Sequence, residues 1–328
     1  MLRIHFTAED LLGVRFADGP VPLLELGLAV AMLQRRDGGP GFARRRRALG
    51  TPRVRAALAP LRQLVPPSGA GPLFLDPPSP DLDQGLDLVR RATATQVRAD
   101  LTRITTAGLP ATALLRRLAD QDQDAWRYLE RAMRAAYPDL VGAAWPQLRA
   151  GFDTDLAWRG RVQREQGLRG MLAGLYPGSR WRAAVLEIPA RREVDVRLDG
   201  AGLLLMPSAQ WTGGPLAGRY SGGTLLVYPA LTPLPYLHLP EPAPGTADDP
   251  IATLLGRTRA AVLRLTADEP TTSRLAAELG ISLPTASEHT RALRNAGLIT
   301  TARTGRAVRH SCTSLGHHLL TAGATRDG

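Results

Sequence analysis

Residues 271–299 read TTSRLAAELGISLPTASEHTRALRNAGLI, and this stretch decides the fold of the C-terminal part of the chain. Thr271 can cap a short helix, because its hydroxyl accepts a hydrogen bond from a free backbone N–H of the first turn. Gly280 permits a sharp turn after that helix, since glycine has no Cβ to clash. Ser282 can cap a second helix, with Pro284 in the first turn, where no intrahelical donor is required. The stretch therefore predicts two helices joined by a tight turn.

The second of these helices has an apolar side and a polar side. Ala286, Thr290 and Leu293 recur at helical spacing, so we expect them to be buried. The opposite side carries hydroxyl and charged side chains, namely Thr285, Ser287, Glu288 and Arg291. We expect this polar side to face outward.

Two short strands are expected to follow. Residues 298–303 have the alternating pattern of a strand, which ends in a turn at Thr304-Gly305. The chain returns as a second strand over residues 306–310. An amphipathic helix over residues 251–265 comes before the helix-turn-helix pair. One helix, then a helix-turn-helix, then a strand pair with three arginines is the order of elements in a winged helix.

The pattern L-A-A-E-L-G-I-S-x-x-T-x-S-x-H-x-x-x-L-x-x-A-G-L-I, which begins at Leu275, resembles the DNA-binding head of ArsR-type repressors, with MarR-type heads a more distant relation. The resemblance covers about 65 residues, a fifth of the chain. The residues before it look like an uncharacterised module that precedes such heads in actinobacterial regulators. Metal-sensing members carry a Cys-x-Cys pair on the helix before the recognition helix, but residues 273–279 contain no cysteine. His317 and His318 are adjacent in sequence, so on a helix their side chains point about 100° apart and do not share a metal ion unaided. We therefore expect no metal site.

The resemblance implies that the helix over residues 282–296 lies in the major groove of double-stranded DNA, with its N-terminal residues nearest the bases. Arg291 would then contact guanine or clamp a phosphate, and Glu288 would accept from cytosine or orient a neighbouring arginine. The strand pair over residues 298–310 is the wing, and its three arginines would contact the DNA backbone or the minor groove. The candidate DNA-contacting residues are Thr271, Ser282, Pro284, Thr285, Ser287, Glu288, Arg291, Arg303, Arg306 and Arg309.

The resemblance also implies a homodimer on a two-fold site, because one recognition helix reads only a few base pairs. Three surfaces remain as candidates for the dimer contact, and the sequence does not choose among them: the helix over residues 251–265, the stretch over residues 317–320, and the large N-terminal module.

Charge is concentrated in two places. The chain has 328 residues and a formal net charge of +11, and all of its basic residues are arginine. Residues 35–55 hold eight arginines against one acidic residue, and residues 251–315 hold nine against four. These two segments account for the whole positive excess, as expected if one or both meet a polyanion.

Three features outside the helix-turn-helix have alternative interpretations. The run Arg44–Arg47 is either a solvated face or a second phosphate-contacting surface. Trp211 lies in a Gly/Pro-rich stretch, so it either belongs to a core or lines a ligand pocket. Cys312 is a packed strand residue or, alternatively, a redox switch; as the chain's one cysteine, it excludes a disulfide framework.

The expected fold class is α+β. Residues 1–177 read as mainly helical, and residues 178–239 as a small antiparallel β region in which Asp199-Gly200 turns a hairpin. Residues 240–250 are a proline-rich linker, and residues 251–328 form the winged helix domain. The apolar stretch over residues 21–33 is interrupted and too short to cross a bilayer, and no signal peptide precedes it. We therefore expect a cytoplasmic protein with no membrane association.

Two functions from different classes remain. In the first, the protein is a transcriptional regulator, a repressor, whose N-terminal module senses a small-molecule effector or organises the dimer. In the second, an enzyme-like N-terminal module carries a regulatory DNA-binding head. The sequence has no glycine-rich phosphate loop, no G-x-S-x-G or H-E-x-x-H motif, and no cysteine with a companion histidine. We expect no catalytic residue and no cofactor, which favours the first function.

Overall fold

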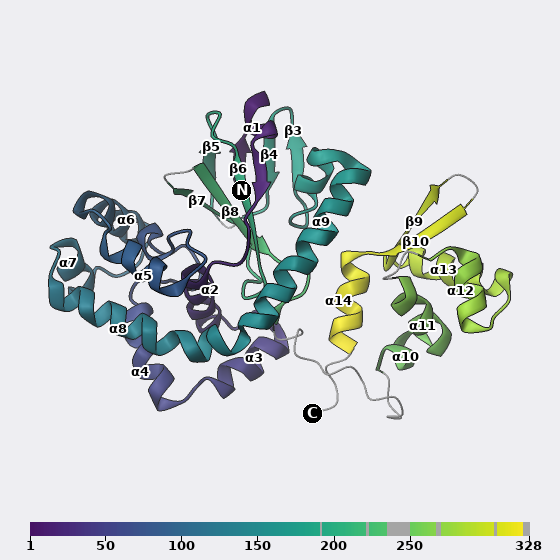
Figure 1. Ribbon diagram of the computed structural model, residues 1–328, viewed down its shortest axis with the longest axis horizontal. Helices are drawn as coiled ribbons and strands as arrows, with labels where there is room; N and C mark the ends of the chain where they lie inside the picture. The colour runs from purple at the N-terminus through teal and green to yellow at the C-terminus, as the bar shows by residue number, and fades with distance from the viewer. Residues whose placement is uncertain (191, 221–222, 235–249, 267–269, 305–306, 324–328) are drawn as a thin grey trace. The chain divides into compact units, whose positions relative to one another are not determined.

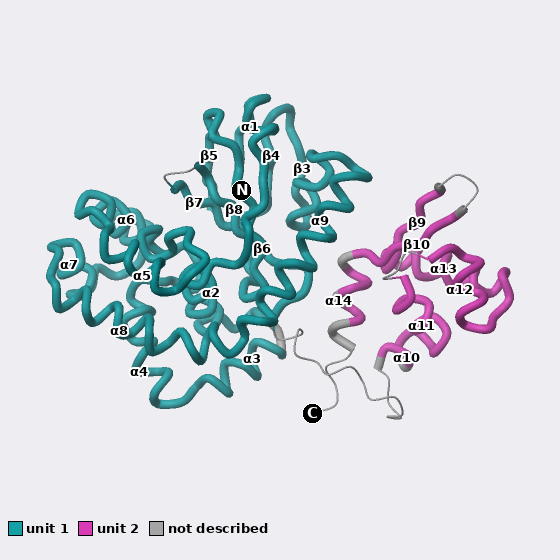
Figure 2. Tube along the Cα trace, viewed as in Figure 1, with its two compact units in different colours: residues 1–235 teal, residues 236–328 magenta. Residues whose placement is uncertain are grey.

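The chain folds into two compact units, Met1–Pro235 and Tyr236–Gly328 (Figure 2). The computed structural model describes all residues except 191, 221–222, 235–249, 267–269, 305–306 and 324–328. The predicted segment 1–177 and all but the last four residues of the segment 178–239 fall in the first unit, and most of the predicted linker lies outside the described residues.

Unit 1 is mainly helical, as Figure 1 shows. Its helices are α1 (Ala8–Leu12), α2 (Pro22–Gln34), α3 (Gly39–Ala48), α4 (Pro52–Leu61), α5 (Leu82–Arg90), α6 (Ala94–Thr106), α7 (Ala113–Ala119), α8 (Gln123–Leu140) and α9 (Trp145–Ala173), with 3₁₀ turns η1 (Leu73–Leu75) and η2 (Gly142–Ala144).

The apolar stretch near the N-terminus becomes a core helix. In α2 nearly every side chain from Pro22 to Met32 is buried, because α3, α4, α5 and α8 pack around it. Such a helix needs no polar face, which is why its sequence is apolar on all sides. Among the described residues, no helix has both the length and the apolar character needed to span a membrane.

Unit 1 also contains two four-stranded sheets. The strands are β1 (Leu2–His5), β2 (Val14–Phe16), β3 (Arg180–Arg182), β4 (Val185–Ile188), β5 (Val194–Arg197), β6 (Leu203–Ser208), β7 (Leu216–Tyr220) and β8 (Gly223–Pro229). The first sheet has the order β3-β4-β1-β5, and the second has the order β2-β6-β8-β7. Strand β1 is antiparallel to β4 and parallel to β5, while β2, β6 and β8 are parallel to one another.

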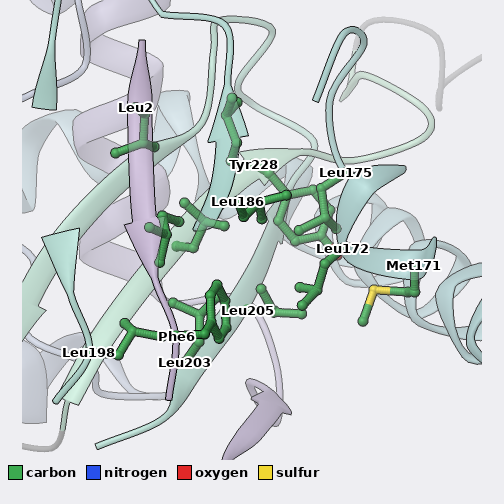
Figure 3. Packing of buried hydrophobic residues seen from close by; sticks show 13 residues of the cluster. Leu2, Phe6, Met171, Leu172, Leu175, Leu186, Leu198, Leu203, Leu205 and Tyr228 are labelled. Carbon is green, nitrogen blue, oxygen red and sulfur yellow. The ribbon is translucent and has the colours of Figure 1, made fainter. Parts of the chain in front are cut away.

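One hydrophobic core joins the two sheets to the last turns of α9 (Figure 3). Leu2 and Ile4 of β1 contribute from the first sheet, Leu205 and Tyr228 from the second, and Leu172 from α9. Strand β1 alternates buried and half-buried residues, which is the pattern of a strand with one covered face.

The α+β fold class is confirmed, but two details of the predicted β region are wrong. The sheets are mixed rather than antiparallel, and β1 and β2 come from the segment predicted to be helical. Asp199 and Gly200 do form a turn, with φ of 55° and 84°. The strands on either side of this turn belong to different sheets, so it is not a hairpin.

Unit 2 contains α10 (Pro250–Leu255), α11 (Arg257–Leu265), α12 (Thr272–Leu279), α13 (Leu283–Asn295), β9 (Ile299–Thr304), β10 (Ala307–Cys312) and α14 (Ser314–Gly323). The predicted single helix over residues 251–265 is two helices, because Gly256 has φ of 84° and breaks it. The remaining order, helix-turn-helix followed by an antiparallel strand pair, is that of a winged helix.

Candidate nucleic-acid interface

The caps that the sequence predicts begin both helices of the helix-turn-helix. Thr271 Oγ1 accepts a hydrogen bond from the backbone N–H of Arg274 at 3.2 Å, and α12 begins there. Helix α12 ends at Gly280, whose φ of 61° is left-handed. Ser282 Oγ accepts from the backbone N–H of Thr285 at 3.2 Å and begins α13. Local hydrogen bonds thus fix where α13 starts.

The inner face of α13 is buried as predicted. Ala286, Thr290 and Leu293 are all covered, and the Thr290 hydroxyl donates to the carbonyl of Ala286 one turn earlier. The core that covers them gathers apolar side chains from every part of the domain: Val262, Leu263, Leu275, Ala286, Leu293, Leu298, Ile299 and Cys312. This core holds α13 in one rotational setting.

The outer face of α13 is open. Exposed side chains line it from its start to its third turn, and they are Ser282, Leu283, Pro284, Ser287, Glu288 and Arg291. Thr285 is half-buried, and its hydroxyl lies 2.7 Å from that of Ser282. Among the described residues, the side chains of Ser287, Glu288 and Arg291 form no hydrogen bond or ion pair. Glu288 therefore does not orient an arginine here, and all three groups are free to meet an external partner.

The wing is a regular antiparallel ribbon. Val308 pairs with Arg303 and Arg309 with Ala302, so the side chains of Arg303 and Arg309 project from opposite faces of the ribbon. Both are exposed, while Arg306 and the turn residue Gly305 lie outside the described residues. Cations on both faces allow a ribbon lying in a groove to approach the phosphates of either wall.

The sequence analysis missed one residue that joins the wing to the helices. His310 of β10 is 3% exposed; its Nε2 lies 2.9 Å from Thr272 Oγ1 and its Nδ1 lies 3.0 Å from Thr301 Oγ1. The backbone N–H of His310 donates to the carbonyl of Pro270, and Arg309 and Thr271 form an isolated antiparallel β-bridge. The alternation of β10 places residue 310 on the same face as buried Cys312, which is the signal that could have shown its burial.

Thr271 has its hydroxyl engaged as a cap and is half-buried, as Thr285 is. Cys312 is 1% exposed in the domain core, in agreement with a packed strand residue.

The candidate ligand residue of unit 1 lies in a core. Trp211 is 1% exposed, and its Nε1 donates to the carbonyl of Gly214 at 2.8 Å. A Cβ on Gly213 would fall 2.1 Å from the indole ring, so the backbone packs directly on it. The guanidinium of Arg35 lies 4.9 Å from the ring centroid. The structure therefore places Trp211 among packed residues, with no ring face open to solvent.

Comparison with known families identifies the C-terminal part only. A family described as a helix-turn-helix domain matches residues 254–302. No curated protein and no solved structure matches the chain. The match spans α11, α12, α13 and most of β9, which are the elements that hold the open face of α13. Residues 254–302 thus form a helix-turn-helix domain, which supports a DNA-binding, regulatory role for the chain.

Proposed function

We propose that the protein is a transcriptional repressor of the ArsR-like kind that binds a two-fold site in double-stranded DNA as a homodimer. Helix α13 lies in the major groove, and the wing formed by β9 and β10 contacts the backbone or the minor groove. The observation that carries this proposal is the outer face of α13, where Ser287, Glu288 and Arg291 are exposed beside an ordered cap.

The chemistry of that face suits base recognition better than charge attraction alone. A guanidinium can donate two hydrogen bonds to guanine, a carboxylate can accept from cytosine, and hydroxyls bond phosphates or bases. A surface that bound DNA only through phosphates would gain nothing from Glu288, since its charge repels the backbone.

Homodimer formation is supported by apolar side chains on two neighbouring helices of unit 2. Leu254 of α10 is 68% exposed and Leu315 of α14 is 56% exposed, and these helices pack against each other. A second copy that covers both leucines would bury apolar surface and place two recognition helices on one duplex.

Unit 1 is proposed to sense a small molecule or to organise the dimer, and the proposal gives it no catalytic activity. A ligand that prefers one arrangement of the two heads would change DNA affinity by its differential binding to the two states.

The test is selection of duplexes from a random pool by the full-length protein, followed by binding measurements on the selected and the unselected DNA. We expect selected sites with two-fold symmetry. A triple variant, Ser287→Ala with Glu288→Ala and Arg291→Ala, should lose the preference for them.

Helix α12 offers a control of the same composition. Ser273, Arg274 and Glu278 are all exposed, and replacing these three with alanine removes the same side-chain types. This control variant should keep the wild-type ratio of affinity for selected DNA to affinity for unselected DNA. Equal, weak binding of wild type to every duplex would overturn the proposal, as would a control variant that loses the preference as fully as the α13 variant does.

A further inference from the structure

The arginine run of α3 divides into two inward and two outward side chains. Arg45 donates to the side-chain oxygen of Gln210 and, at 2.5 Å, to the carbonyl of Leu140. Arg46 donates to the carbonyl of Arg35. These two half-buried side chains bind other parts of unit 1, so their guanidinium groups are already engaged.

The outward side chains continue into the next helix. Arg44 and Arg47 are exposed and three residues apart on α3, so they lie on one side of it. Three residues separate the end of α3 from the start of α4, and Arg53 and Arg55 in the first turn of α4 are exposed too. The other exposed residues between Arg47 and Arg55 are Ala48, Gly50, Thr51 and Pro52, which are small and uncharged. We call Arg44, Arg47, Arg53 and Arg55 the α3–α4 arginines; Figure 1 shows these two helices in succession along one edge of unit 1.

No acidic residue of the neighbouring sequence neutralises this surface. Residues 38–75 contain seven arginines and no Asp or Glu. Some other exposed arginines of unit 1 do have carboxylate partners: Arg117 with Asp122, Arg134 with Asp83, and Arg180 with Glu187 are examples. Within the described residues, none of the α3–α4 arginines forms an ion pair. Four unpaired cations in twelve residues repel one another, and a polyanion relieves that repulsion.

We propose that the α3–α4 arginines are a second DNA-contacting surface, which binds the phosphate backbone of the duplex beside the site held by the winged helix. The proposal rests on the function proposed above. It assigns unit 1 a role in affinity and leaves the choice of sequence to α13.

Duplex DNA is the polyanion that the chain itself brings to this surface. Both units belong to one chain, so a duplex bound by unit 2 is presented to unit 1 at high effective concentration. Arginine also matches phosphate geometry, because its planar fork donates two parallel hydrogen bonds. The exposed residues between the arginines are small and uncharged, so they add no charge that would oppose phosphate binding.

The test uses the full-length protein and two labelled duplexes that contain the same selected site. One is about two helical turns long, and the other extends to about five turns with unselected sequence. Binding is measured by fluorescence anisotropy over a range of salt concentrations, and the slope of log K against log [salt] is compared. Each phosphate contact contributes about 0.9 to this slope. For wild type we expect a steeper slope on the long duplex than on the short one, a result that needs no variant.

The variant changes all four α3–α4 arginines to glutamine. We expect its slope on the long duplex to fall by up to about 3.6 for each bound protomer, the value for four phosphate contacts, and to approach the slope on the short duplex. The control changes four other exposed arginines of unit 1 to glutamine, at positions chosen on different helices and loop ends: Arg91, Arg116, Arg131 and Arg164. It removes the same charge, and its slope should stay near that of wild type. Circular dichroism melts of both variants check that unit 1 remains folded.

Three results would overturn this inference. The first is equal slopes on the two duplexes for wild type, and the second is an equal change in slope for variant and control. Loss of heparin binding by the variant with unchanged slopes on DNA would also overturn it, since the occupant would then be another polyanion. If substitutions on α13 leave sequence preference intact, the proposed function fails as well; if they abolish it while the α3–α4 variant behaves like its control, only the inference fails.

Discussion

His310 Nε2 lies 2.9 Å from Oγ1 of Thr272, so a side chain of the wing is hydrogen-bonded to the first turn of α12. On the other side of the ring, Nδ1 lies 3.0 Å from the hydroxyl of Thr301 in β9. A neutral imidazole donates through one nitrogen and accepts through the other, and a threonine hydroxyl can do either. The ring therefore fixes the wing relative to the helix-turn-helix while leaving no buried nitrogen unpaired.

Acid should weaken this connection. Burial, and to a lesser extent the charge of Arg294, lowers the pKa of His310 below its ordinary value of 6.5. In that case the unfolded chain binds the proton more readily than the folded one. The stability contributed by His310 is present above pH 6.5 and declines as the pH falls through that value toward the lowered pKa.

We expect the urea midpoint of unit 2 to decrease when the pH is lowered from about 7.5 to about 5.5. The substitution His310→Gln should abolish the part of this decrease that is due to His310. His5→Gln serves as the control, because His5 lies in unit 1, where its half-buried ring is hydrogen-bonded to the carboxylate of Asp195. A His310→Gln protein that keeps the full acid sensitivity would show that another group is responsible.

The opposite pH dependence is expected in unit 1. Glu25 is 1% exposed, and burial raises its pKa to about 8 in spite of a hydrogen bond from Ser208 and the charge of Arg45. A carboxyl whose folded pKa is raised contributes stability at low pH, below its ordinary value of 4.5. That stability is lost as the pH rises toward 8, because the unfolded chain ionises first.

Glu25→Gln should therefore flatten the stability profile of unit 1 between about pH 5 and about pH 8 by a few kcal/mol, since one pKa unit is worth about 1.4 kcal/mol. The amide keeps an oxygen that can accept from Ser208. The exposed Glu165→Gln change is the control and should leave the profile unaltered. Parallel profiles for wild type and Glu25→Gln in chemical unfolding would contradict the assignment.

Gly280 is the position where the helix-turn-helix depends on glycine. Its φ of 61° lies in the left-handed region, and an added Cβ there would meet no neighbouring atom within 4 Å. The cost of Gly280→Ala is thus conformational and not steric, about 1 kcal/mol of unfolding free energy. Gly280→Asn should cost less, because asparagine tolerates this conformation. Thermal unfolding of the two variants ranks them, and an alanine variant as stable as wild type would be inconsistent with the left-handed cap.

Features set by local chemistry were predictable, whereas features set by distant partners were not. The caps at Thr271 and Ser282 bond their own first turns, so a short window of sequence contains all of their partners. Strand β1 was missed because four alternating residues are too short a pattern to predict a strand, and its partners β4 and β5 lie at least 180 residues away. The turn at Asp199-Gly200 was found, yet the sequence could not show that β5 and β6 belong to different sheets.

The arginine run illustrates the same limit at the level of a site. Whether Arg45 points inward or outward depends on Gln210 and Leu140, which the sequence places far from it. Sequence alone showed the charge, and the fold decides which of the guanidinium groups are free. The break at Gly256 had a visible signal, since glycine inside a helical pattern weakens the case for one continuous helix.

The exposed leucines of unit 2 lead to a test of the dimer. Leu254→Arg places a charge in the middle of the proposed apolar contact, which an interface core disfavours. We expect sedimentation to show loss of dimer, together with weaker binding to two-fold sites. Leu88→Arg changes a leucine of α5 that is 47% exposed and should leave the assembly intact. A Leu254→Arg protein that sediments as wild type does would move the dimer contact to unit 1.

Two arginines of unit 2 should have separable roles on DNA. Arg291 lies on the outer face of α13, where a guanidinium can bond guanine, so Arg291→Ala should cost about 1–3 kcal/mol on the selected site and relax base preference there. Arg303 lies on the wing, where we expect it to contact the DNA backbone, so Arg303→Ala should weaken binding to all sequences alike and lower the salt slope by about 1. The same result is expected for Arg306→Ala. Competition binding with selected and random duplexes measures both effects. Identical effects of Arg291→Ala and Arg303→Ala on preference would show that α13 is not the reading element, because only a residue that contacts bases can distinguish one sequence from another.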